Sequence, residues 1–70
     1  MSLGEERVRL QFNPSGNPLV NEIKSRTAEL INLCEDWKRT EPTPEGKRLM
    51  ALAETAYEEA SMWAVKAVTA

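Results

Sequence analysis

The sequence has little of what most catalytic and metal sites are built from. It contains no histidine and a single cysteine, Cys34. Histidine is the commonest general base and metal ligand, and one cysteine cannot form an intrachain disulfide. No glycine-rich phosphate loop occurs, and no apolar run approaches the roughly 20 residues of a membrane-spanning helix. We therefore expect no enzyme, no metal, no cofactor and no membrane association, and we interpret Cys34 as a small core residue.

Positive charge is not in excess either. Nine lysines and arginines face eleven acidic residues, for a net charge of −2. Such a chain has no overall field to attract duplex nucleic acid, and its cations form no continuous basic face. They do gather in local pairs, which can bind a small anion. The pairs are Arg7/Arg9, Lys24/Arg26, Lys38/Arg39 and Lys47/Arg48.

The first long helix is predicted over residues 18–39. Asn17 is a favourable N-cap, and Pro18 at the first helical position loses no hydrogen bond. Lys38 and Arg39 place positive charge where the helix dipole prefers it. The apolar positions repeat at intervals of three and four, which predicts the seam of a helix pair. They are Val20, Ile23, Thr27, Leu30, Cys34 and Trp37.

The second long helix is predicted over residues 44–68, and it repeats the same start signal. Thr43 supplies a hydroxyl N-cap, and Pro44 occupies the first helical position. The short connection between the two helices forces them to run antiparallel. The expected fold class is therefore all-α, with residues 1–70 forming a single helical-hairpin domain.

The N-terminal segment lacks a helical pattern. Residues 1–6 are expected to be a mobile terminus. Polar and apolar side chains then alternate over Arg7–Phe12, which is typical of extended backbone. The stretch Asn13–Pro18 is rich in residues that favour turns. Residues 7–17 are therefore predicted to form a short extended arm and a turn, lying against a helix or a neighbouring subunit.

The second helix carries more apolar side chains than one neighbour can cover. A single partner helix covers a stripe about 100° wide, and this helix has two stripes. The first is Leu49, Ala53, Ala56, Ala60, Trp63 and Ala67, and the second is Met50, Tyr57, Ala64 and Val68. We expect another copy of the chain to cover the extra stripe, so the protein is predicted to be a homo-oligomer. Trp63 is assigned to the core and Tyr57 to the space between subunits.

The end of the N-terminal arm is the first candidate binding site. An aromatic ring such as Phe12 can stack on a nucleobase, and the amide of Asn13 can contact a base edge or a ribose. Lys24 and Arg26 on the first long helix can meet a phosphate. The alternative is that Phe12 fills the hairpin core and the cations are solvated.

The start of the second long helix is the other candidate. A helix N-terminus offers free backbone N–H groups to an anion. Gly46 is unfavourable inside a helix unless a ligand or a backbone approaches closely. Lys47 and Arg48 can then close on a phosphate. The alternative is a frayed first turn with solvated cations.

Several short stretches resemble one phage protein family. They are Phe12-Asn13-Pro14, the helix with Lys24 and Ala28, Glu45-Gly46-Lys47-Arg48, and Glu58-Glu59-Ala60-Ser61-Met62-Trp63-Ala64. Together they resemble the helical-hairpin family of anti-CBASS cyclic-oligonucleotide sponges, which shares its hairpin with a group of anti-Thoeris sponges. The resemblance covers about residues 7–68.

The resemblance implies a cytoplasmic homohexamer, in an infected bacterium, that sequesters cyclic dinucleotides such as cyclic GMP-AMP without hydrolysing them. The CBASS effector is then deprived of its signal. Family members also hold cyclic trinucleotides in a separate pocket. The dinucleotide residues implied are Phe12, Asn13, Pro14, Lys24, Arg26 and Thr27, and the trinucleotide residues are Gly46, Lys47 and Arg48. The family usually has tyrosine where Phe12 stands, so a hydroxyl contact is absent while stacking is retained.

A second function remains open from the sequence. The chain can instead be a structural oligomer or an adaptor that binds a host protein through the apolar face of its second long helix. A binder of duplex DNA is disfavoured, because the chain is acidic and its cations are dispersed in pairs.

Overall fold

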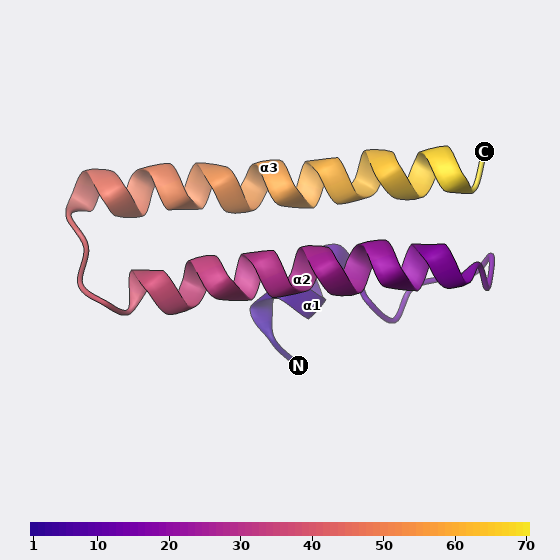
Figure 1. The fold of residues 1–70 in the computed structure, drawn as a ribbon, viewed down its shortest axis with the longest axis horizontal. Helices are drawn as coiled ribbons and strands as arrows, with labels where there is room; N and C mark the ends of the chain where they lie inside the picture. Colours follow the sequence, from indigo (N-terminus) through magenta and orange to yellow (C-terminus); the bar gives the residue numbers. More distant parts are fainter.

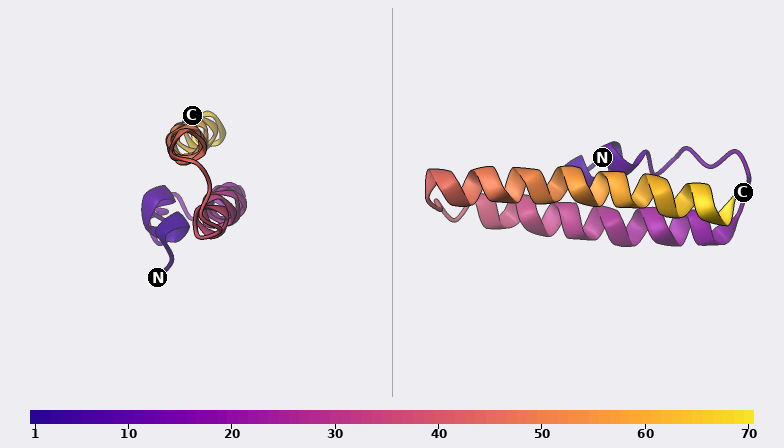
Figure 2. Two further views of the ribbon diagram at one scale, coloured as in Figure 1. Left: turned by 90° about the vertical axis from the view of Figure 1, so that its left-hand side faces the viewer. Right: turned by 90° about the horizontal axis from the view of Figure 1, so that it is seen from above.

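The computed structural model describes residues 1–70 as three helices and no strand. Helix α1 spans Leu3–Val8, α2 spans Pro18–Lys38 and α3 spans Pro44–Val68. Helices α2 and α3 form an antiparallel hairpin 41 Å long, and α1 packs mainly on α2 beside it (Figures 1 and 2). None of the three helices is both long and apolar enough to pass through a bilayer.

Both long helices begin where their caps predict. The Asn17 side chain accepts a hydrogen bond from the Leu19 N–H, and the Thr43 hydroxyl accepts one from the Gly46 N–H. These bonds satisfy backbone donors that the helix itself leaves unpaired. Helix α2 ends at Lys38, one residue earlier than expected, because Arg39 serves as its C-cap.

The N-terminal segment differs from the prediction. Residues 1–6 are not a mobile terminus and Arg7 does not begin an extended arm, because Leu3–Val8 is helical. Ser2 and Glu5 form a capping box, in which each side chain accepts from the other residue's N–H. This local signal outweighs an alternating pattern too short to identify a strand. The helix ends at Arg9, whose backbone is left-handed with φ 57° and ψ 55°.

Glycine allows α1 to lie directly on α2. The Gly4 N–H donates to Asn32 Oδ1 at 2.9 Å. A Cβ atom on Gly4 would lie 2.2 Å from the carbonyl oxygen of Ala28, which is far inside van der Waals contact. Val8, one turn further along α1, then joins Ala28 and Ile31 in a buried apolar cluster.

The inward face of the hairpin overlaps only in part with the face that its apolar pattern predicts: on α2, Val20 and Cys34 of the predicted seam are buried. On α2 the buried residues are Val20, Lys24, Ala28, Ile31 and Cys34. Leu30 and Trp37 of the predicted seam are exposed instead. On α3 the two buried residues are Glu54 and Ser61, both polar. The structure confirms the prediction that Cys34 is buried.

The two aromatic side chains of α3 have exchanged their expected places. Trp63 is 56% exposed and Tyr57 packs against the apolar cluster inside the chain. Leu49 and Leu52 are exposed on the outer side of α3 as well. Glu54 and Ser61 are the residues of α3 that are buried against the rest of the chain. The stripe with Tyr57 lies on the same side and faces α2, whereas most of the stripe with Trp63 faces outward.

The buried carboxylate of Glu54 is compensated by a neighbouring cation. Glu54 is fully buried, and its carboxylate forms an ion pair with the Lys38 ammonium. The same ammonium lies 2.8 Å from a carboxylate oxygen of Glu35. Burial raises the pKa of Glu54, and Glu35 beside it raises that pKa further. Hydrogen bonds with Glu54 and Lys38 lower the pKa of Glu35, so Glu35 loses its proton more readily than Glu54 does.

We predict that Gly4→Ala destabilises the protein. Alanine is favoured over glycine in a helix by about 0.5–1 kcal/mol, so the substitution would be stabilising if α1 had room. The clash with the Ala28 carbonyl reverses the sign, and overpacking of this kind costs about 1–3 kcal/mol. Urea unfolding measures the difference. Ser25→Ala, on an exposed part of α2, is the control, and a Gly4→Ala variant as stable as the native protein would contradict the packing of α1.

We predict that Glu54→Gln becomes progressively more stable, relative to the native protein, as the pH rises above 4.5, the ordinary pKa of glutamate. With its raised pKa, folded Glu54 keeps a proton that the unfolded chain has already released. The stability of the native protein therefore falls as pH rises through that raised pKa. The variant cannot ionise, and it retains the Glu35–Lys38 pair. Thermal unfolding across this range measures the effect, and a melting-temperature difference independent of pH would contradict it.

Candidate functional site

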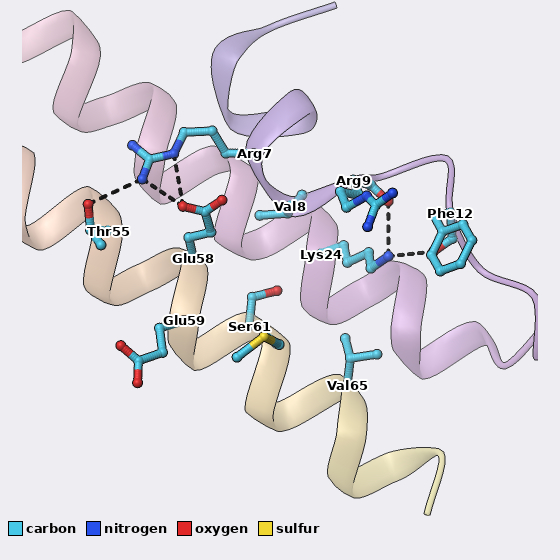
Figure 3. A pocket seen from close by; sticks show the side chains of 11 residues that line it. Arg7, Val8, Arg9, Phe12, Lys24, Thr55, Glu58, Glu59, Ser61 and Val65 are labelled. Atoms are coloured by element: carbon cyan, nitrogen blue, oxygen red, sulfur yellow. Dashed lines mark hydrogen bonds and ion pairs between the residues drawn. The ribbon is translucent and has the colours of Figure 1, made fainter.

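A cavity of about 440 Å³ lies between the end of α1, the turn that follows it, and the second half of α3 (Figure 3). Three cations and one aromatic ring line it, from α1, the turn that follows it and α2: Arg7, Arg9, Lys24 and Phe12. The wall on α3 is formed by Thr55, Glu58, Glu59, Ser61, Met62 and Val65. The cavity therefore joins positive charge, an aromatic face and apolar surface, which suits a small organic anion.

Arg7 ties α1 to α3 at one end of the cavity. Its Nε and Nη2 atoms donate to Glu58 Oε2 at 3.2 and 2.7 Å, and Nη2 also donates to the Thr55 hydroxyl at 3.3 Å. The positive charge of Arg7 is thus already neutralised by a carboxylate. Its evident role is to hold the short helix against the hairpin (Figure 3).

Lys24 is buried under the turn and does not reach out as a free cation. Only 6% of the residue is exposed, and its ammonium donates to the carbonyl of Arg9 at 2.9 Å and to the carbonyl of Phe12. Burial lowers the pKa of Lys24, and the nearby charge of Arg9 lowers it further. Two carbonyl acceptors compensate for the lost hydration. Lys24 therefore holds the segment between α1 and Asn13 against α2.

Phe12 lies on the surface beside these groups. It is 56% exposed, which is contrary to the alternative that it fills the hairpin core. The Arg9 guanidinium carbon lies 5.1 Å from the ring centroid, and the Lys24 ammonium lies 5.5 Å from it. Both are cation–π distances. Cation–π contacts therefore position the ring. It is not enclosed by the core, and so it remains accessible for stacking.

A smaller cavity of about 210 Å³ adjoins the first and shares Phe12, Lys24 and Val65 with it. Asn13 and Pro14 line this second cavity. The Asn13 amide is occupied within the loop: its nitrogen donates to the Asn17 carbonyl at 3.0 Å and to Asn21 Oδ1 at 3.1 Å, and its oxygen accepts from Ser15.

The structure does not bring the other two predicted dinucleotide residues into either cavity. Arg26 pairs with Glu22 on the exposed side of α2, where the closest atoms are 2.9 Å apart. The Thr27 hydroxyl donates to the Ile23 carbonyl of its own helix at 2.7 Å.

The predicted trinucleotide residues lie at the opposite, closed end of the hairpin (Figure 1). A Cβ atom on Gly46 would come within 2.9 Å of the Trp37 ring, so packing against α2 already accounts for this glycine. Arg48 forms a two-pronged pair with Glu45, at 2.7 and 2.8 Å. Lys47 alone has no carboxylate partner there.

The sequence interpretation grouped Arg7 with Arg9 but placed both on an extended arm, and it gave Glu58 no part in a site. The missed signal is the capping box of Ser2 and Glu5, which predicts that a helix starts there. How that helix docks then brings Arg7 to Glu58 and Arg9 to Phe12. Glu58 has no sequence signal of its own, because its pairing with Arg7 depends on how α1 docks.

The fold and the cavity define a class of small helical-hairpin protein with a ligand-sized cationic cavity beside the hairpin. Within that class, residues 4–69 match the family model described as the Acb2/Tad1 hairpin domain. The chain belongs to this family, which is the family of anti-CBASS and anti-Thoeris sponges that its sequence resembles. Membership indicates a sponge-type anti-defence role and a ligand-binding domain. Searches of curated proteins and of solved structures found no match.

We predict that Lys24→Ala lowers the free energy of unfolding by about 1–3 kcal/mol, because two carbonyls of the turn lose a buried donor. Thermal and urea unfolding measure the loss. Lys47→Ala removes the same type of side chain from an exposed position and should change stability by less than about 0.5 kcal/mol. Equal stability of the two variants would show that Lys24 does not fasten the turn.

Proposed function

We propose that this protein is a non-enzymatic sponge that binds and sequesters cyclic dinucleotides in the cytoplasm of an infected bacterium, and so prevents activation of a CBASS effector. The observation that carries the proposal is the cationic cavity beside an exposed aromatic ring, in a chain of the Acb2/Tad1 hairpin family. A cyclic dinucleotide carries two bases that can stack and two phosphodiesters that need positive charge. The cavity offers both kinds of contact, and Phe12 and Lys24 are among the residues that line it.

The composition of the cavity favours binding over turnover. It contains no histidine or cysteine, and its carboxylates on α3 face a structural partner: Glu58 accepts from Arg7 and Glu59 from the Trp63 indole. No group there is arranged as a nucleophile beside a base. Retention of the intact ligand is the outcome such a site supports.

We further propose that the protein acts as a homo-oligomer, a hexamer in the form implied by the resemblance. The isolated chain leaves a large part of its apolar side chains in water. The exposed members on α2 and α3 are Leu19, Leu30, Leu33, Trp37, Leu49, Leu52, Met62 and Trp63. Met62 also lines the cavity, so a subunit packed on this side of α3 would border the ligand. Apolar surface on this scale favours association.

The separate cyclic-trinucleotide site at Gly46, Lys47 and Arg48 stays a prediction from the resemblance. Arg48 is engaged with Glu45, so a ligand there would have to compete with that carboxylate. Lys47 is the residue through which such a site is best tested, because its charge is free.

Native mass spectrometry with a mixture of cyclic di- and trinucleotides tests the proposal. We expect an oligomer that gains discrete, unhydrolysed dinucleotides. Phe12→Leu keeps an apolar side chain but removes the stacking face, and should lose about 1–3 kcal/mol of binding free energy in calorimetry. Phe12→Tyr should retain binding. An oligomer that takes up no cyclic nucleotide would overturn the sponge proposal and favour the adaptor that binds a host protein through α3.

A further inference from the structure

Arg9 is the one cation of the cavity whose hydrogen-bond donors are all free. Arg7 is neutralised by Glu58 at 2.7 Å, and Lys24 is surrounded by carbonyl oxygens of the turn. The Arg9 guanidinium forms no ion pair and no hydrogen bond, and its only polar engagement is with the face of Phe12, 5.1 Å from the ring centroid. Stacking occupies the face of a guanidinium and leaves the N–H groups around its edge available.

The backbone at Arg9 points to the same residue. Arg9 is the left-handed C-cap of α1, at φ 57°, and glycine is the residue that this conformation favours. A long cationic side chain stands there instead, and the Lys24 ammonium holds its carbonyl oxygen in place. The fold thus accepts an unfavourable backbone conformation at the residue that carries the free charge, which is a pattern found at functional sites.

We infer that Arg9 binds a phosphodiester group of the ligand, and that Lys24 acts as a positioning residue that holds Arg9 and Phe12 in place. This inference rests on the proposed function for the identity of the ligand. A planar guanidinium matches two phosphate oxygens with paired N–H donors, which the enclosed ammonium of Lys24 cannot do without releasing the turn. Arg9 lies against the face of Phe12, so its free N–H groups can meet a phosphodiester that adjoins a base stacked at this ring.

The left-handed backbone provides a sharp test. Arg9→Gly removes the side chain and relieves the backbone, so the variant should melt no lower than the native protein. It should nevertheless bind cyclic GMP-AMP roughly ten- to hundredfold more weakly in calorimetry, as expected for loss of a charge-assisted hydrogen bond. A structural role for Arg9 would instead lower the melting temperature. Binding by Arg9→Gly at native affinity would overturn the inference and leave the sponge proposal standing.

The chain contains a matched control. Glu41 has the same left-handed φ of 57°, but it lies in the connection between α2 and α3 at the closed end of the hairpin. Glu41→Gly relieves the same conformation far from the cavity, so it should raise the melting temperature or leave it unchanged, and keep native affinity within about twofold. An equal loss of affinity in both glycine variants would overturn the assignment to Arg9.

A second measurement separates the inference from the proposed function. If the native protein binds no cyclic nucleotide, the sponge proposal fails, and the anion site is then tested with inorganic pyrophosphate. In an NMR titration, the Nε–Hε signal of Arg9 should shift more than those of Arg26 and Arg39, which are paired with Glu22 and Asp36. Equal or smaller shifts at Arg9 would overturn the inference.

Discussion

A buried ammonium group sets the path of the N-terminal third of this protein. Lys24 lies on the inward face of α2, where its charge loses most of its hydration and requires hydrogen-bond acceptors. The chain supplies them as the carbonyls of Arg9 and Phe12, and is thereby held close to α2 after α1 ends. The path of the turn that carries Phe12 to the cavity depends on this arrangement, while α1 is also held by the Gly4–Asn32 hydrogen bond and the Arg7–Glu58 pair.

The interior of the hairpin contains charged and polar side chains, while several large apolar side chains lie on its surface. Lys24, Glu54 and Ser61 are buried while Leu33, Leu49 and Trp63 are exposed. Each buried charge has a nearby partner, so the interior is tolerated, but it contributes less hydrophobic stabilisation than an apolar core would. In the oligomer that we propose, other subunits would pack on the apolar side chains that lie outside. Their burial there would add to the stability of the chain.

The cavity is organised by what each cation already contacts. Arg7 is paired with Glu58 and joins α1 to α3, while Lys24 holds the turn from beneath. Only Arg9 keeps its donors free, next to the face of Phe12. The number of positive charges in the cavity therefore overstates the charge available to a ligand. Cations that are already hydrogen-bonded within the protein support the cavity, and a cation with free donors is the one that would contact the proposed ligand.

The sequence alone determined the two long helices, because the caps at Asn17 and Thr43 and the prolines after them are local signals. It also placed Phe12 and Lys24 together through the family resemblance. It misassigned α1, where a short alternating pattern concealed a capping box, and it placed Leu30, Trp37 and Trp63 in the interior, where the structure has them exposed. Only the tertiary structure decided that Glu54 could be buried, since its partner Lys38 lies on the other helix. Hydrophobic periodicity identifies the most apolar face of each helix. It carries no information on whether a charged residue of one helix will be paired with a charge on another.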